Sequence, residues 1–149
     1  MTAQQQRCAI VVADDDEGDR YLIQKAMEDS GVEGEVQFLE DGQVLVDRLN
    51  QDLATSASSG TSTLPCLIIL DLNMPRLDGR DVLKIVKTHP DLKRIPVVIM
   101  TNSRNPQDVE STYRDGANSF FTKPLDYTGL VALMTLLKTY WLERATLPT

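Results

Sequence analysis

Four apolar segments of this 149-residue chain are each followed by polar side chains that could bind a cation or a phosphate. In chain order these are the acidic run Asp14-Asp15-Asp16-Glu17, then Asp71 with Asn73 two residues later, then Thr101, and finally Lys123. The set contains carboxylates, a hydroxyl and an ammonium group, and it contains no histidine. Such groups, meeting at one place, favour chemistry on a phosphate over acid–base chemistry centred on an imidazole.

A cluster of three carboxylates needs a cation beside it, because like charges a few ångströms apart oppose one another's ionisation. Oxygen ligands without histidine or cysteine favour Mg²⁺ over zinc or copper. Lys123 and Thr101 could hold the remaining oxygens of a phosphate bound to that ion. Among the acids, Asp71 is the best candidate for a nucleophile that forms an acyl phosphate, because it follows a strongly apolar segment and is not part of an acidic run.

Each of these residues also has an ordinary structural explanation. The run at 14–17 could cap a helix and favour its dipole, and Asp71 could cap a loop. Thr101 could be a plain strand-end hydroxyl, and Lys123 a solvated charge. Their occurrence together at four predicted strand ends favours a site. His89, the single histidine, is expected at a surface helix end and not as a catalytic base.

Five short segments predict strands, at residues 8–13, 35–40, 66–70, 95–100 and 118–122. Each is followed by a helical pattern, the last from about 126 to 143, whereas the small polar residues 54–64 predict a flexible loop. Strands that alternate with helices indicate a parallel α/β sheet covered on both faces. In such a sheet ligands bind outside the carboxyl ends of the strands, where the polar residues are expected to lie.

Length and composition favour a single folded domain and exclude several classes. A chain of 149 residues that is 42% hydrophobic can bury a core without disulfides or metal ions. With 15 basic and 22 acidic residues, the net charge of −7 disfavours binding to nucleic acid or to a membrane surface. The chain has no apolar leader or membrane-length segment, so a cytoplasmic protein is expected. Cys8 and Cys66 are then expected to be reduced thiols unless the fold brings them together.

Four motifs, VVADDDEGDR, LIILDLNMPRLDG, VVIMTNS and SFFTKPL, together resemble the receiver domain of two-component response regulators. The resemblance covers residues 8–143, with tails expected at 1–7 and 144–149. It implies a flavodoxin-like, doubly wound α/β fold with five parallel strands in the order 2-1-3-4-5 and five helices. It also implies a signalling protein that is not an enzyme beyond catalysing its own phosphorylation and dephosphorylation.

The same resemblance implies a role for each site residue. Asp71 would be the phosphoacceptor. Mg²⁺ would be bound by the carboxylates of Asp15 and Asp71, by the backbone carbonyl of Asn73 and, largely through water, by Asp14. Lys123 would pair with the phosphoryl group.

Three further positions would take part in switching or in aiming the lysine. Thr101 would move toward the phosphoryl group, and Phe120 would turn inward as Thr101 moves. The peptide bond before Pro124 would be cis and would aim Lys123. The sequence departs from the usual family pattern at Asn102, a bulkier residue that could slow access to the phosphoryl group, and at Phe120, which lacks the hydroxyl of the commoner tyrosine.

The implied function is that of a single-domain response regulator that accepts a phosphoryl group from a sensor histidine kinase and switches protein–protein interactions. The blocks DLNMPRLDGRDVL, LKRIPVVIMTNS and YWLERATLP are similar to the small stand-alone regulators partnered with bacterial and cyanobacterial phytochromes. A phytochrome-type kinase is therefore the candidate donor. Output would pass through the fourth helix, fifth strand and fifth helix, and a homodimer through the C-terminal half is a further candidate.

Three other functions stay open at this point. A phospho-independent adaptor would have the receiver fold without using its chemistry. A small aspartyl-phosphate phosphatase would begin its motif as Asp71-Leu72-Asn73 does, but it would need a second aspartate in place of Asn73. A phosphorelay intermediate would pass its phosphoryl group on to a histidine phosphotransferase.

Overall fold

The computed structural model describes residues 9–148. Five of its segments form a sheet of parallel strands. The strands lie in the order β2-β1-β3-β4-β5, so the doubly wound fold that the resemblance implied is confirmed. Their bounds are Ile10–Ala13 for β1, Val36–Leu39 for β2, Leu67–Leu70 for β3, Val97–Thr101 for β4 and Ser119–Thr122 for β5. The winding reverses between β1 and β3, so the carboxyl ends of these two strands border the crevice where such sheets bind ligands.

Five α-helices alternate with the strands, and a side chain caps the start of each one. They are α2 (Glu17–Asp29), α3 (Gly42–Ser59), α4 (Gly79–Thr88), α5 (Pro106–Arg114) and α6 (Tyr127–Leu137). The caps are Asp16, Asp41, Asp78, Asn105 and Asp126, each of which accepts a backbone N–H of the first turn. Each cap fixes where its helix begins, and with it the length of the loop that leaves the sheet. No helix in the described part of the chain has the length and hydrophobicity needed to cross a membrane.

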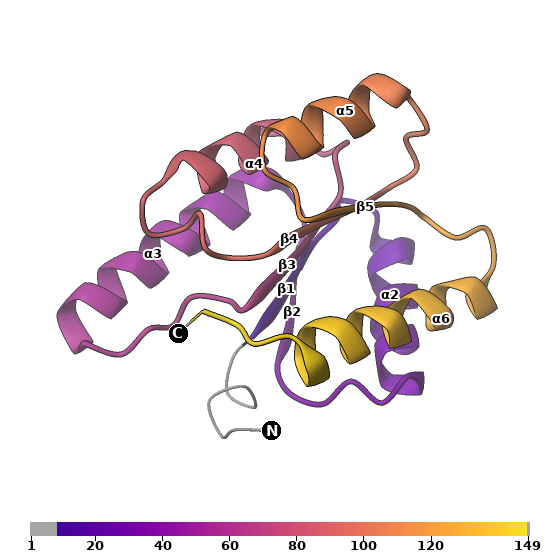
Figure 1. Ribbon diagram of the computed structural model, residues 1–149, viewed down its shortest axis with the longest axis horizontal. Coiled ribbons are helices and arrows are strands. Elements are labelled where there is room, and N and C mark those ends of the chain that lie inside the picture. Colours follow the sequence, from indigo (N-terminus) through magenta and orange to yellow (C-terminus); the bar gives the residue numbers. More distant parts are fainter. Residues whose placement is uncertain (1–8, 149) are drawn as a thin grey trace.

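The helices cover both faces of the sheet. In Figure 1, α3, α4 and α5 lie on one face, and α2 and α6 lie on the other. β1, β3 and β4 are buried along their whole length, and their side chains alternate between the faces. Val11 and Ile68 join the core beneath α3 and α4, while Val12 and Ile69 join the core beneath α2 and α6. Burial on both faces explains why these strands are apolar without interruption.

The flexible loop expected at 54–64 is shorter than predicted, because α3 continues to Ser59. The hydroxyls of Ser58 and Ser59 donate to the Thr55 carbonyl at 3.1 and 2.8 Å. Serine hydroxyls bonded backward in this way are compatible with a helix. Gly60 then ends α3 with a left-handed φ of 74°. The small polar composition was therefore a poor guide to the end of this helix.

The last helix, expected from about 126 to 143, changes its geometry part of the way along. The chain stays helical, but after α6 it forms a π-helix, η1 (Lys138–Arg144). The N–H of Ala145 donates to the Tyr140 carbonyl five residues back (2.7 Å), which is the wider spacing of a π-helix. Hydrophobic periodicity predicted the extent of this helix and did not distinguish the two helix types.

Cys66 is disulfide-bonded, so the expectation of a reduced thiol at this position was wrong. The start of β3 lies beside the start of β1, where the Cys66 N–H donates to the Ala9 carbonyl (2.9 Å). The fold thus places Cys66 beside Ala9, the residue directly before β1. Cys8 and the tail expected at 1–7 lie outside the described residues.

The start of α4 packs directly against the end of β3. The Gly79 N–H donates to the Leu72 carbonyl (2.8 Å). A Cβ atom on Gly79 would lie 2.1 Å from the Asp71 carbonyl oxygen. Only a movement of the backbone could relieve this steric overlap. Glycine is therefore required here so that α4 can hold the loop that follows Asp71.

Gly79→Ala is expected to lower the free energy of unfolding by about 3 kcal/mol, because the added methyl group would overlap backbone atoms, which cannot change rotamer as a side chain can. Urea denaturation gives this value. Gly60→Ala is the control, because its Cβ would meet nothing within 4 Å and only its positive φ is strained, at a cost of about 1 kcal/mol. Equal losses in the two variants would contradict the close packing at Gly79.

Candidate functional site

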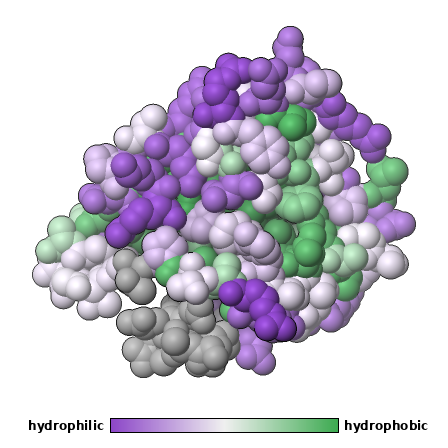
Figure 2. Space-filling view, viewed as in Figure 1, coloured by the Kyte–Doolittle hydropathy of each residue, from purple (hydrophilic) through white to green (hydrophobic). Residues whose placement is uncertain are grey.

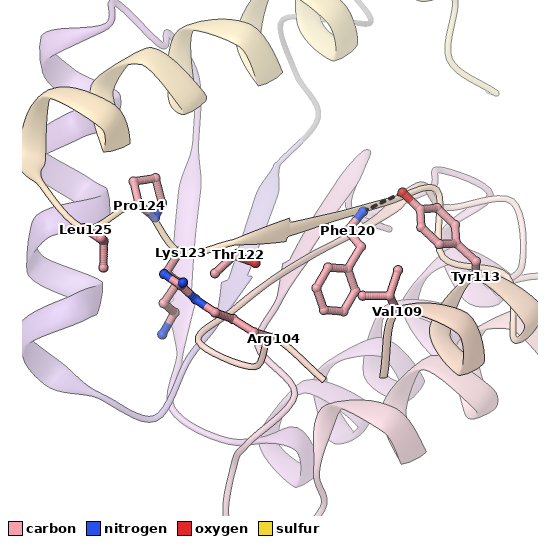
Figure 3. A pocket seen from close by; sticks show the side chains of 8 residues that line it. All are labelled: Arg104, Val109, Tyr113, Phe120, Thr122, Lys123, Pro124 and Leu125. Carbon is pink, nitrogen blue, oxygen red and sulfur yellow. Dashed lines mark hydrogen bonds between the residues drawn. The ribbon is translucent and has the colours of Figure 1, made fainter. Parts of the chain in front are cut away.

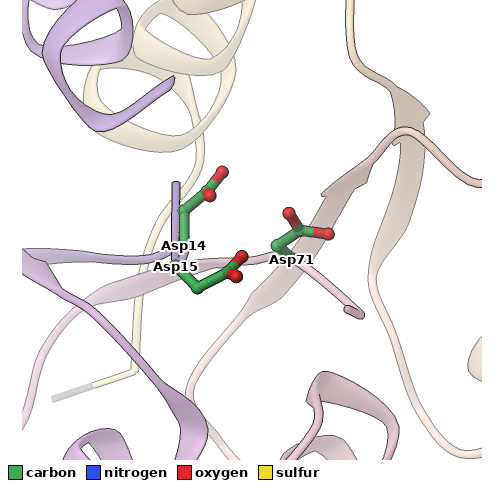
Figure 4. A group of neighbouring side chains, drawn as sticks. All are labelled: Asp14, Asp15 and Asp71. Carbon is green, nitrogen blue, oxygen red and sulfur yellow. The ribbon is translucent and has the colours of Figure 1, made fainter. Parts of the chain in front are cut away.

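Three carboxylates meet at the carboxyl edge of the sheet (Figure 4). Asp14 and Asp15 follow β1, Asp71 follows β3, and each offers an oxygen within 4.8 Å of those of the other two. The two strands pair in register, with Ala13 opposite Leu70, so the residues that follow them lie side by side. Asp14 and Asp71 are buried, whereas Asp15 is exposed. The fold thus brings these three sequence-predicted residues together.

Lys123 follows β5 and extends its ammonium group to the same carboxylates. Its Nζ lies 2.7 Å from Asp14 Oδ2, 2.9 Å from Asp71 Oδ2 and 2.7 Å from Asp19 Oδ2. Burial alone would lower the pKa of Lys123, but hydrogen bonds to the three aspartates outweigh burial and raise the pKa above its ordinary value. Lys123 is therefore the charged group that compensates the buried carboxylates.

Asp14 is the most deeply buried acid of the cluster, with 1% of its surface exposed. Burial raises the pKa of its carboxyl group, while hydrogen bonds from Lys123 and from the Asp16 N–H (2.9 Å) act in the opposite direction. The Arg20 guanidinium donates to the Asp14 backbone carbonyl (2.8 Å) and so steadies the loop. The Asp14 carboxylate is held where a further positive charge would be favourable.

The acids of the run at 14–17 have two different structural roles. Asp14 and Asp15 belong to the carboxylate cluster, whereas Asp16 accepts the Asp19 N–H (2.8 Å) and caps α2. The ordinary explanation of the run is therefore right for Asp16. Sequence reasoning missed Asp19 as a contact of Lys123. The signal that could have found it is its position in the first turn of α2, close behind the acidic run.

Asn73 lies on the loop that follows β3, and Thr101 is the last residue of β4. The Asn73 N–H donates to Asp71 Oδ1 (3.3 Å). Thr101 is fully buried at the end of β4, and its carbonyl accepts the Lys123 N–H (2.8 Å). The Thr101 hydroxyl accepts the Ser103 N–H (3.4 Å). Both predicted residues therefore lie at the same edge of the sheet as the carboxylate cluster.

Phe120 lies on β5, on the side toward α5. It lines an open pocket together with Val109 and Tyr113 of α5 (Figure 3), and its N–H donates to the Tyr113 hydroxyl (3.1 Å). Lys123 and Pro124 line the same pocket. The pocket thus connects the lysine of the site with the surface formed by α5 and β5.

The cis peptide bond expected before Pro124 is absent. The described backbone contains no cis peptide bond. A trans bond is the lower-energy isomer even before proline. Lys123 reaches Asp14 and Asp71 with the trans bond, so the cis isomer is not needed to aim its side chain.

The carboxylate cluster fits a small, hard divalent cation. Its three donors are carboxylate oxygens, which are the ligands that Mg²⁺ prefers. His89, the single histidine of the chain, is the C-cap of α4 at the far end of that helix from Gly79. The site therefore offers a lysine and carboxylate oxygens that suit a cation and a phosphate, and it does not offer an imidazole base.

Lys123→Met is expected to lower the free energy of unfolding by about 3 kcal/mol in EDTA, because it leaves buried carboxylates without their cation. The raised pKa of Lys123 means that its contribution is fully present up to the ordinary lysine pKa of 10.5 and is lost only as the pH rises further. Added Mg²⁺ is expected to recover part of the loss. Urea denaturation with EDTA or with Mg²⁺ measures both effects.

Lys25→Met on the exposed side of α2 is the control for that experiment, since it removes the same charge away from the cluster. A Lys123→Met variant as stable as Lys25→Met, from neutral pH upward, would contradict the compensating role of Lys123.

The chain matches the family model described as the response regulator receiver domain over residues 10–135. It is 37% identical over 139 residues to the response regulator Rcp1 of Synechocystis sp., an alignment that covers 93% of this chain and 92% of that relative.

Three solved structures are similar over nearly the whole chain. The Mn(2+)-bound form of Rcp1 has a TM-score of 0.80 and 36% identity, and the match covers 95% of this chain and 99% of that one. The phosphorylated cyanobacterial phytochrome response regulator RcpA has a TM-score of 0.84 and 36% identity, covering 96% and 99%. The bacteriophytochrome response regulator RtBRR has a TM-score of 0.73 and 31% identity, covering 95% and 84%. Together with the strand order and the carboxylate cluster, these matches show that the chain belongs to the response regulator receiver domain family.

Proposed function

We propose that Asp71 accepts a phosphoryl group from the phosphohistidine of a sensor kinase, with Mg²⁺ beside it, and that the modification switches protein–protein contacts. The observation that carries this proposal is the position of Lys123, whose ammonium group joins Asp71 to Asp14 where three carboxylates converge. A carboxylate between an ammonium group and a cation site has both charges that a transferred phosphoryl group requires.

Asp71 is the nucleophile in this proposal. Its side chain is held at both oxygens, since Oδ1 accepts the Asn73 N–H and Oδ2 accepts from Lys123. One carboxylate oxygen bonds to phosphorus while the phosphorus–nitrogen bond of the donor breaks and its electron pair leaves with the histidine. The product is an acyl phosphate on Asp71. Lys123 would then exchange a carboxylate contact for a phosphoryl oxygen.

The residues that would hold Mg²⁺ are Asp14, Asp15, Asp71 and the backbone carbonyl of Asn73. When bound, the ion supplies positive charge that stabilises the transferring phosphoryl group. The fit of the oxygen donors supports this assignment, as does the description of the relative Rcp1 in a Mn(2+)-bound form.

Thr101 and Phe120 are proposed to carry the switch. The Thr101 hydroxyl would turn toward the phosphoryl group, and Phe120 would move within the pocket that it shares with α5 (Figure 3). Phe120 has no hydroxyl, so it would act through packing. The output surface would then be α5, β5 and α6, and Figure 2 shows a hydrophobic area between β5 and α6. Leu125, which follows β5, is 92% exposed. Leu136, which lies on α6, is 54% exposed.

The proposed partner is a sensor histidine kinase of the phytochrome type. The support is the similarity to RcpA and RtBRR, which are described as phytochrome and bacteriophytochrome response regulators. We propose that the phosphoryl transfer from this kinase takes place in the cytoplasm. A homodimer through the C-terminal half is a further proposal, supported by the exposed apolar side chains of α6 and η1, among them Leu136 and Tyr140.

The adaptor and phosphatase alternatives gain no support. The relative Rcp1 and the solved structure of RcpA, which match over nearly the whole chain, are response regulators. Receiver domains of this family are signalling proteins rather than conventional enzymes. A phosphorelay intermediate is a variant of the proposed function, and transfer from Asp71 to a histidine phosphotransferase would identify it.

Incubation with Mg²⁺ and a small acyl-phosphate donor is expected to add one phosphate to the wild-type chain, because Asp71 is held as a nucleophile between positive charges. Intact-protein mass after rapid quenching measures the product. Asp71→Asn is expected to take up no phosphate, and removal of Mg²⁺ with EDTA is expected to slow the wild type at least tenfold.

Asp81→Asn is the matched control, because it makes the same change at an exposed acid on α4 and is expected to react as the wild type does. Equal phosphate uptake by wild type and Asp71→Asn would contradict the assignment of the nucleophile. Absence of uptake from small donors and from a phosphorylated phytochrome-type kinase would contradict the proposed function as a whole.

A further inference from the structure

An arginine of α4 and an aspartate of α5 form a bridge beside the site. The Arg80 guanidinium donates from Nε to Asp108 Oδ1 (2.9 Å) and from Nη2 to Asp108 Oδ2 (2.8 Å). Such two-pronged pairs are among the strongest contacts between side chains. The Asp108 side chain is only 14% exposed, so the pair is partly shielded from water. This Arg80–Asp108 bridge joins the first turns of α4 and α5.

The bridge extends to both loops that border Asp71. Ser103, which lies between β4 and α5, donates its hydroxyl to Asp108 Oδ2 (2.5 Å). Arg80 Nη1 lies 3.5 Å from Asn73 Oδ1, a distance at which a hydrogen bond is weak. The bridge therefore acts chiefly on the β4–α5 loop, residues 102–105, which Ser103 fastens to α5.

The fastened loop is the one that follows Thr101. The Ser103 N–H donates to the Thr101 hydroxyl oxygen (3.4 Å), and Thr101 is fully buried. If the Thr101 hydroxyl moves toward a phosphoryl group on Asp71, its contact with the Ser103 N–H must lengthen or the loop after it must follow. Ser103 resists that movement while Asp108 holds its hydroxyl.

The charges of the bridge are well matched. Hydrogen bonds from Arg80, and next from Ser103, lower the pKa of Asp108 below its ordinary value. The Asp108 carboxylate in turn raises the pKa of Arg80. Both groups are thus charged at neutral pH, and the bridge is present in the unmodified protein.

We propose that Arg80 and Asp108 are positioning residues that hold the β4–α5 loop in its unphosphorylated arrangement and so oppose the phosphorylation of Asp71. This inference rests on the proposed function, because it concerns the reaction of the same carboxylate. Contacts made in only one of two arrangements shift the equilibrium toward that arrangement. Their removal is expected to speed phosphorylation roughly fivefold or more.

The test follows phosphate uptake over time, by intact mass, with a small acyl-phosphate donor and Mg²⁺. Asp108→Asn keeps the shape of the side chain and removes its charge, and Ser103→Ala removes the fastening hydroxyl; each is expected to react roughly fivefold faster or more. The double variant is expected to gain little further, because both changes cut one connection. Ser103→Thr keeps a hydroxyl and is expected to retain the wild-type rate.

Glu110→Gln is the matched control on the same helix. Glu110 pairs with Arg114 (3.1 Å) where both side chains are exposed, so the variant loses an ion pair of α5 that does not reach the β4–α5 loop. Its rate of phosphorylation is expected to equal that of the wild type. Amide hydrogen exchange at residues 102–105 is expected to rise in Asp108→Asn and to stay unchanged in Glu110→Gln.

The outcomes separate this inference from the function on which it rests. If the wild type takes up phosphate on Asp71 and the Asp108→Asn and Ser103→Ala variants react no faster, the bridge has no such role and the proposed function stands. A gain in rate for Glu110→Gln equal to that of Asp108→Asn would also overturn the role of the bridge. A wild type that takes up no phosphate from any donor would overturn the proposed function and this inference with it.

Discussion

One ammonium group holds the carboxyl edge of this sheet together. Lys123 contacts Asp14 and Asp71, which are both buried, as well as Asp19 at the start of α2. Buried carboxylates attract a cation strongly because little water screens them. The protein supplies one positive charge from its own chain, and the remaining acidic oxygens are left for a second cation. Stability and chemistry at this edge therefore depend on the same few charges.

The order of the strands makes that contact possible. β1 and β3 are neighbours, so the acids that follow them lie together. β5 is separated from β3 by β4, and the long side chain of Lys123 spans the end of β4. The backbone supports it there, since the Thr101 carbonyl accepts the Lys123 N–H. Lys123 also lines the pocket beside Phe120. A change at Asp71 that moves Lys123 would therefore alter the pocket at the α5–β5 surface.

The sequence predicts most of the fold and the main site residues because their signals are local. Apolar runs and the polar residues directly after them locate the strands and the edge where Asp71 and Lys123 meet. Contacts that depend on how distant elements pack leave no such signal. The pairing of Arg80 with Asp108, 28 positions apart, follows only from the placement of α4 beside α5. The trans bond before Pro124 likewise has no local signal, because both isomers are accessible before a proline.

We propose that the carboxylates held by Lys123 form one divalent cation site that includes Asp71. Calorimetric titration with Mg²⁺ near neutral pH measures binding at this site in the wild type, in Asp71→Asn and in the control Asp81→Asn. We expect one bound ion per chain in the wild type and in Asp81→Asn, and an affinity weaker by roughly tenfold or more in Asp71→Asn. Equal affinity in all three proteins would contradict it, because Asp71 would then not belong to the site.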